Sequence, residues 1–147
     1  MQWTKDDFII TTDKANINVD YVHQFLTRSY WAEEIPIETI GRAIEGSICF
    51  SVFYLNQQIG FARVITDEAT FAYLADVFID EKFRGKGLSK WLMDIIVNYP
   101  SLHGLRRFVL VTRDAHGLYR QFGFQPLNNV GGWMQIHNPG VYKKPKE

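Results

Sequence analysis

The residues with the clearest chemical potential form the run Arg84-Gly85-Lys86-Gly87-Leu88-Ser89, which lies between an apolar segment and a helical pattern. Backbone N–H groups at a helix N-terminus are unpaired and carry partial positive charge. Gly85 and Gly87 let an anion approach those groups, because glycine has no side chain, and Arg84 and Lys86 add full charges. The run predicts a site for a phosphate or pyrophosphate, and a charged surface turn is the alternative.

Two common phosphate-binding motifs do not fit this run. The dinucleotide-binding motif needs a third glycine where Lys90 stands, and the P-loop needs a Gly-Lys-Ser/Thr that is missing at the required spacing. Residues 82–120 carry eight basic and two acidic residues, whereas residues 1–81 carry five basic and thirteen acidic ones, and the net charge is zero. A compact positive block in a neutral chain favours a small polyphosphate ligand over nucleic acid.

The elements that position this loop follow from hydrophobic spacing and turn residues. The charged loop over 80–87 separates an antiparallel meander from a helix and a buried strand, so the strands flanking that helix should be parallel. The sequence thus predicts one mixed α/β domain over 1–147. The expected strands are 8–10, 48–55, 59–65, 71–79 and 107–112, with closing strands at 124–127 and 133–137, and the expected helices are 19–29, 36–44, 88–97 and 115–122.

A second motif follows the last strong strand: Thr112-Arg113-Asp114-Ala115-His116-Gly117-Leu118-Tyr119-Arg120-Gln121-Phe122-Gly123-Phe124. With the first motif it resembles the GNAT superfamily of acyl-CoA-dependent N-acyltransferases, whose signatures are Arg/Gln-x-x-Gly-x-Gly/Ala and Asn-x-x-Ala-x-x-Leu-Tyr-x-x-x-Gly-Phe. Ser89 and Thr112 depart from the usual Gly/Ala and Asn. The order and separation of the motifs match over about residues 5 to 137.

The resemblance implies a GNAT-like fold in which strands 71–79 and 107–112 splay apart, and acetyl-CoA as the acyl donor. Backbone groups of Val77 and Ile79 would meet the pantetheine as an added strand, and the pyrophosphate would lie on the amides of 85–89. The positions expected to bind the donor are Val77, Phe78, Ile79, Arg84, Gly85, Lys86, Gly87, Leu88, Ser89, Asp114, Gly117 and Tyr119.

The resemblance also implies two catalytic residues. Tyr119 matches the family's general acid for the leaving thiolate, and the alternative is a core aromatic beside Leu118 and Phe122. Asp76 lies inside an apolar strand, where a carboxylate needs a partner or a function. It is expected to act through water as the base, and the alternative is a structural partner of backbone groups or Arg63.

The acceptor side is expected in the acidic first half of the chain. Tyr30, Trp31, Phe71 and Tyr73 are candidates for an aromatic wall, and carboxylates of Glu33, Glu34 or Asp67 would attract a cationic amine. Phe71 and Tyr73 share one face of their strand by the period of two. The alternative is core packing for the aromatic side chains and solvation for the carboxylates.

The remaining features define the setting. The four histidines show no metal-ligand spacing, so no metal is expected, and the single cysteine, Cys49, reads as a buried core thiol. The chain opens with no signal-like stretch and has no apolar run of membrane-spanning length, so a cytoplasmic protein, without membrane association, is expected. It is expected to be a monomer or homodimer.

The function predicted from the sequence is an N-acetyltransferase that acts on a primary amine, with a small-molecule acceptor preferred and direct attack in a ternary complex. The alternatives are a peptide or protein N-acetyltransferase and a non-catalytic acyl-CoA-binding module on the same fold.

Overall fold

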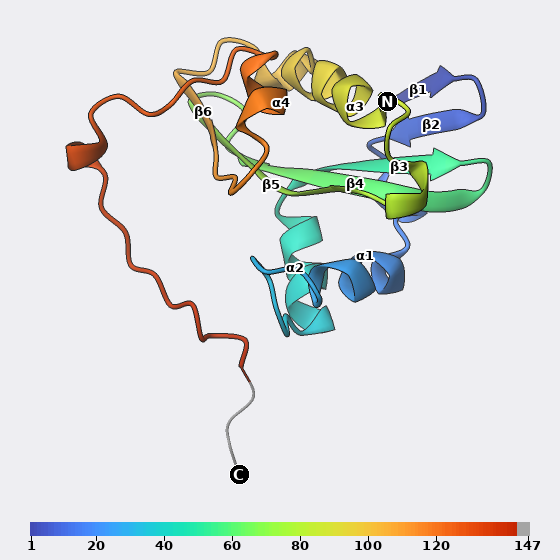
Figure 1. Cartoon of the computed structure of the whole chain (residues 1–147), viewed down its shortest axis with the longest axis horizontal. Coiled ribbons are helices and arrows are strands. Elements are labelled where there is room, and N and C mark those ends of the chain that lie inside the picture. Colours follow the sequence, from blue (N-terminus) through green and yellow to red (C-terminus); the bar gives the residue numbers. More distant parts are fainter. Residues whose placement is uncertain (144–147) are drawn as a thin grey trace.

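A six-stranded mixed sheet organises the chain in the computed structural model, which describes residues 1–143 (Figure 1). The strands lie in sequence order, and each pairs antiparallel with the next except β5 and β6, which are parallel. This is the predicted meander followed by a βαβ unit. The strands are β1 (Gln2–Lys5), β2 (Phe8–Thr11), β3 (Ile48–Tyr54), β4 (Gln57–Thr66), β5 (Phe71–Ile79) and β6 (Arg107–Leu110).

Helices cover both faces of the sheet (Figure 1). One face carries α1 (Val19–Leu26) and α2 (Ile37–Glu45), and the other carries α3 (Leu88–Val97) and the short α4 (His116–Arg120). Each face has its own buried apolar cluster. Cys49 belongs to the cluster under α1 and α2, where burial raises the pKa of its thiol to about 11. No helix within residues 1–143 is long and apolar enough to cross a membrane.

A β-bulge interrupts β5 at Asp76. The β4–β5 register shifts between Phe61 and Arg63, and Asp76 has a φ of 56° in the left-handed region. A bulge bends its strand and increases the local twist. The β5–β6 ladder ends just before it, at the pair Leu74–Leu110, although β5 continues to Ile79. The predicted splay of the two strands therefore begins at the bulge.

Two parts of the predicted layout were incomplete or wrong. The strand β1 was missed, because Gln2–Lys5 lacks a buried face. The closing strands at 124–127 and 133–137 do not form, and β6 is the last strand of the sheet. Pro126 has no N–H for a ladder, and the turn from Asn129 (φ 59°) to Gly132 sends the chain away from β6.

Candidate active site

The loop after β5 presents bare main chain at the start of α3. Gly85 and Gly87 have φ values of 81° and 76°, which side chains rarely tolerate, and Gly87 is the N-cap of α3. No side chain caps this helix, and the first turn closes with the Trp91 amide donating to the Gly87 carbonyl. The amides before Trp91 are left for solvent or a ligand, with the positive end of the helix dipole behind them.

Arg84 anchors this loop to the end of β5. Its Nε donates to the Ile79 carbonyl at 3.2 Å. Asp80 supports the same turn, because its carboxylate accepts from the Lys82 amide at the start of the 3-10 turn Glu81–Phe83. Arg84 thus has a structural contact besides the charge it brings to the loop, and Lys86 is exposed.

Past the bulge, β5 has a free edge toward β6. Val77, Phe78 and Ile79 have no partner on β6. Their side chains are committed to the two cores: Phe78 stacks on Phe25 with ring centroids 3.8 Å apart, and Val77 packs on the α3 side. What these residues offer to a ligand in the gap is their main chain.

The second motif forms the turn into α4. The Thr112 hydroxyl accepts from the Ala115 amide at 3.1 Å, so the residue that replaces the family's asparagine caps this turn. Asp114 and Gly117 are exposed. Tyr119 is only 9% exposed and packs edge-on against Phe124. Burial, and then the neighbouring Tyr30 and Asp114, raise the pKa of the Tyr119 phenol above its ordinary value.

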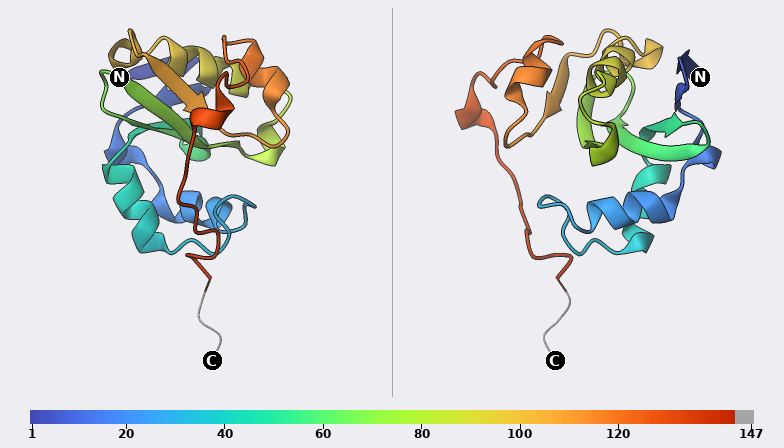
Figure 2. Two further views of the ribbon diagram at one scale, coloured as in Figure 1. Left: turned by 90° about the vertical axis from the view of Figure 1, so that its left-hand side faces the viewer. Right: turned by 45° about the vertical axis from the view of Figure 1, so that its right-hand side comes forward.

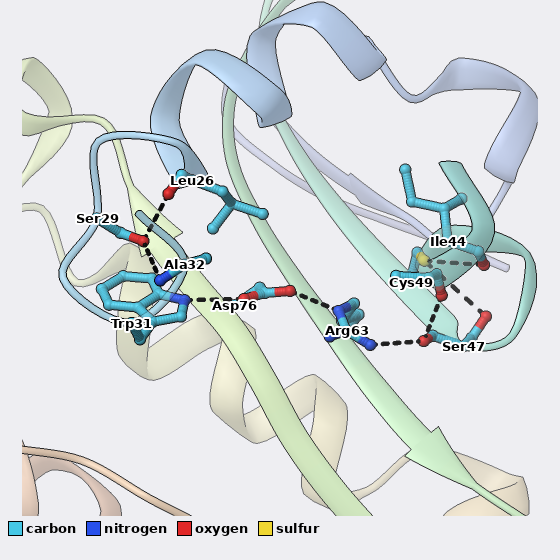
Figure 3. Close-up of polar contacts among 10 residues, drawn as sticks. Leu26, Ser29, Trp31, Ala32, Ile44, Ser47, Cys49, Arg63 and Asp76 are labelled. Carbon is cyan, nitrogen blue, oxygen red and sulfur yellow. Dashed lines mark hydrogen bonds and ion pairs between the residues drawn. The ribbon is translucent and has the colours of Figure 1, made fainter. Parts of the chain in front are cut away.

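Asp76 joins three segments of the chain through its carboxylate (Figure 3). Arg63 Nε, on β4, forms a close ion pair with Oδ2, and the Trp31 indole N–H donates to Oδ1 at 2.8 Å. Arg63 also donates to the Ser47 hydroxyl at 3.1 Å. The Arg63 partner was the sequence's alternative for Asp76, and the Trp31 contact was not foreseen.

The acceptor-side aromatics lie in two pairs. Tyr30 and Trp31 contact each other edge-on, at 5.1 Å between centroids, in the loop between α1 and α2. Phe71 and Tyr73 lie together on one face of β5, and neither ring contacts Tyr30 or Trp31 within the described chain. They do not form one continuous wall. Trp31 reaches β5 at Asp76 instead.

Arg113 is a contact residue that sequence reasoning missed. Its guanidinium lies over the Tyr30 ring, 3.8 Å from Cζ to the centroid. Because Trp31 is bonded to Asp76 and Tyr30 is covered by Arg113, the α1–α2 loop is fastened to both sides of the splay. The only sequence signal was an arginine within the second motif. Asp67, in contrast, is occupied in the β4–β5 turn, where hydrogen bonds from the Thr70 amide and hydroxyl, and then from the Ala69 and Phe71 amides, lower its pKa.

A cavity of about 480 Å³ lies elsewhere, between β6, α4 and residues 122–127. Tyr119 and His116 line it, but no residue of β5 or of the loop 80–87 does. Its lining is therefore separate from the bare-amide loop.

Comparison with known proteins agrees with this geometry. Residues 45–126 match the family described as "Acetyltransferase (GNAT) domain". The Gibberella zeae protein FG08082, which bears the name of an acetyltransferase, is 31% identical over 91% of this chain and 88% of its own length. A crystal structure of a Xanthomonas campestris protein assigned to the GNAT family shares 43% identity with a TM-score of 0.92, covering 96% of this chain and all of that one. A Clostridium acetobutylicum acetyltransferase structure that contains acetyl-CoA has the same fold at 16% identity and a TM-score of 0.66, over 88% of this chain and 94% of that one.

The chain therefore belongs to the GNAT acetyltransferase family. It is an acyl-CoA-dependent N-acyltransferase, and acetyl-CoA is the acyl donor that GNAT acetyltransferases use.

Proposed function

We propose that this chain, as one catalytic domain, transfers the acetyl group of acetyl-CoA to the primary amine of a small molecule by direct attack in a ternary complex. The observation that carries this proposal is the opening at the Asp76 bulge. There the free edge of β5 and the bare amides after Gly85 lie on the donor side, and a carboxylate and aromatic rings lie on the other. Donor and acceptor can thus meet without a covalent enzyme intermediate.

In this proposal the donor binds mainly through main chain. The pantetheine amides pair with the backbone of Val77 and Ile79, which lack a β6 partner. The pyrophosphate lies on the amides of 85–89 at the start of α3. Phe78 contributes only its backbone because its ring is stacked on Phe25, and Asp114 and Gly117 lie on the exposed side of the α4 turn.

The chemistry needs an oxyanion donor, an acid and a proton acceptor. The amine nitrogen attacks the thioester carbon, a backbone N–H of the splayed strand stabilises the oxyanion, and the C–S bond breaks. Tyr119 supplies the proton to the leaving thiolate. Its raised pKa supports this role, because the phenol keeps its proton at neutral pH and above. The proton lost by the amine passes through water toward Asp76.

Asp76 also orients the acceptor in this scheme. Arg63 and Trp31 each bond one of its oxygens, so the carboxylate, whose side chain is 8% exposed, is fixed at the bulge and keeps lone pairs that can accept from one ammonium or water. Trp31 offers an aromatic ring beside it, whereas one face of Tyr30 is already occupied by Arg113. A small molecule is preferred because the α1–α2 loop is fastened at two points across this side, at Asp76 and at Arg113, which favours a compact acceptor over a peptide.

An acceptor screen by thiol release tests the proposal. Cys49 will not react with the thiol reagent, because it is buried and its pKa is raised to about 11. Some small primary amines should give saturable rates, and varying both substrates should give intersecting double-reciprocal lines. Parallel lines would indicate a covalent intermediate. Faster turnover of peptide N-termini or lysines would favour the protein-acceptor alternative, and no turnover in any class would favour a non-catalytic module.

A further inference from the structure

A cation lies on the β6 side of the opening, as Asp76 lies on the β5 side. Arg113 follows β6, and its guanidinium lies over the Tyr30 ring, 3.8 Å from Cζ to the centroid. Tyr30 belongs to the α1–α2 loop, which approaches the end of β6 from the side of the sheet opposite α4 (Figures 1 and 2). The contact therefore holds a positive charge where the two layers of the molecule meet.

The charge of Arg113 is not balanced in the way that the charge of Arg63 is. Arg63 is paired with Asp76, and this is the one ion pair among residues 1–143. Arg113 lies on an uncharged ring instead, and its side chain is exposed. Asp114, the next residue, is exposed as well and forms no ion pair with it within those residues. The charge of Arg113 is thus available to a ligand.

The contact with Tyr30 prepares the guanidinium to bind an anion. At 3.8 Å from the ring centroid, the group is in van der Waals contact with the ring. An arginine that stacks on an aromatic face keeps its N–H groups available at the edge of the planar fork. The contact also restricts a long side chain, which lowers the entropy lost when it binds a ligand. The paired donors of the fork match two oxygens of a carboxylate or of a phosphate.

One line of contacts joins this cation to Asp76. The Asp76 carboxylate accepts from the Trp31 indole at 2.8 Å, and Trp31 meets Tyr30 edge-on, at 5.1 Å between centroids. Tyr30 in turn lies under Arg113. In the proposed function the acceptor amine binds at the Asp76 end of this line. An acceptor that extends along the two rings brings its far end to Arg113, where an anionic group is attracted and a cationic group is repelled.

We propose that the acceptor is an amine that also carries an anionic group, a carboxylate or a phosphate, and that Arg113 binds this group. The inference rests on the proposed function, because it assigns the second end of the same acceptor site. Asp76 selects the amine and Arg113 selects the anion, so a zwitterion satisfies both ends, whereas a simple alkylamine satisfies one. Arg113 is in this scheme a specificity-determining residue and takes no part in the chemical step.

Matched pairs of amines test the inference, with thiol release from acetyl-CoA as the measurement. The carboxylate probes are β-alanine, γ-aminobutyrate and ε-aminocaproate, each compared with its uncharged primary amide. The phosphate probe is phosphoethanolamine, compared with ethanolamine. At least one anionic probe should exceed its uncharged counterpart in kcat/KM by about tenfold or more, the value of a charge-assisted hydrogen bond. The pair with the larger ratio shows whether the anion is a carboxylate or a phosphate.

The variant Arg113→Gln tests whether this residue causes the preference. It should raise the KM of the anionic probe about tenfold or more. The kcat, the KM of the uncharged counterpart and the KM of acetyl-CoA should stay nearly unchanged. Arg113→Lys keeps the charge but loses the planar fork, so it should restore part of the preference. The control is Arg106→Gln, which removes an exposed arginine just before β6, at the other end of that strand, and should leave the preference intact.

Three results overturn the inference. No anionic probe exceeds its counterpart, or the preference survives in Arg113→Gln, or that variant raises the KM of both members of a pair equally. The last result would make Arg113 only a fastening point of the α1–α2 loop. All three leave the proposed function in place as long as uncharged amines turn over. If no amine turns over in the unmodified enzyme, the proposed function fails, and this inference fails with it.

Discussion

The two sides of the opening at Asp76 differ in the groups that they present: main-chain groups on one side and side chains on the other. In the proposed scheme the donor binds mainly to main chain, at the free edge of β5 and the amides around Gly85 and Gly87, with Tyr119 as the side chain that meets the leaving thiolate. The acceptor side consists of side chains from distant segments, joined where Trp31 and Arg63 meet Asp76. A main-chain site tolerates much sequence change as long as its glycines remain, whereas a side-chain site changes with each substitution. In the proposal, the donor that the family shares binds to main chain, and the acceptor that is particular to this chain binds to side chains.

The largest expected effect is on the donor side, where Tyr119→Phe should lower kcat about a hundredfold with little change in acetyl-CoA affinity. The substitution removes only the proton that the thiolate receives. Because burial raises the pKa of this phenol above its ordinary value, the unmodified enzyme should lose no activity through its ionisation at neutral or mildly alkaline pH. Tyr99→Phe is the matched control, since Tyr99 is another partly buried core tyrosine and lies at the end of α3. An unchanged kcat would make Tyr119 a core residue only.

The next effect concerns Asp76. Asp76→Asn keeps the shape and suits the left-handed backbone, because asparagine tolerates a φ of 56°. It removes the charge that faces the amine, so kcat/KM for the acceptor should fall about tenfold and the alkaline rise of activity should flatten. The KM for acetyl-CoA should be unchanged. A pH profile parallel to that of the unmodified enzyme would leave Asp76 as the structural partner of Arg63.

A smaller effect distinguishes a lost pyrophosphate contact at the bare amides from the cost of backbone strain. Gly87→Ala and Gly104→Ala place a methyl group at the same φ of 76°, and neither methyl would meet another atom within 4 Å. Both should lose about 1–2 kcal/mol of stability. Only Gly87→Ala should also weaken acetyl-CoA binding in calorimetry, about tenfold, because its methyl group lies where the pyrophosphate would approach. Equal affinities in the two variants would argue against that contact.

The smallest effect belongs to Trp31. Trp31→Phe keeps an aromatic ring and removes the N–H that donates to Asp76. The KM for the amine should rise about three- to tenfold, the value of one charge-assisted hydrogen bond at a half-exposed position, with kcat nearly unchanged. Trp91→Phe, on α3, is the control. A drop in kcat equal to that of Asp76→Asn would mean that Trp31 acts on the chemical step.

The sequence predicted the main-chain geometry of the loop 80–87 better than the side-chain contacts around Asp76, for a physical reason. The glycines of the loop 80–87, the helix that follows it and the βαβ order are local patterns, and local patterns determine main-chain geometry. The bulge has no such signature, because aspartate in a strand does not reveal a positive φ. Trp31 and Asp76 are 45 positions apart, so only the folded chain brings them together. The absent closing strands show the reverse case: residues 133–137 have a strand pattern, but only Trp133 contacts β6, over Arg107, and the segment forms no ladder with that strand.

A crystal structure with coenzyme A bound tests the central claim most directly. The account predicts pyrophosphate oxygens about 3 Å from the amides of residues 85–89, and pantetheine amides paired with the backbone of Val77 and Ile79 beyond the Asp76 bulge. Coenzyme A seated instead in the 480 Å³ cavity between β6 and α4, with the loop 80–87 untouched, would contradict it.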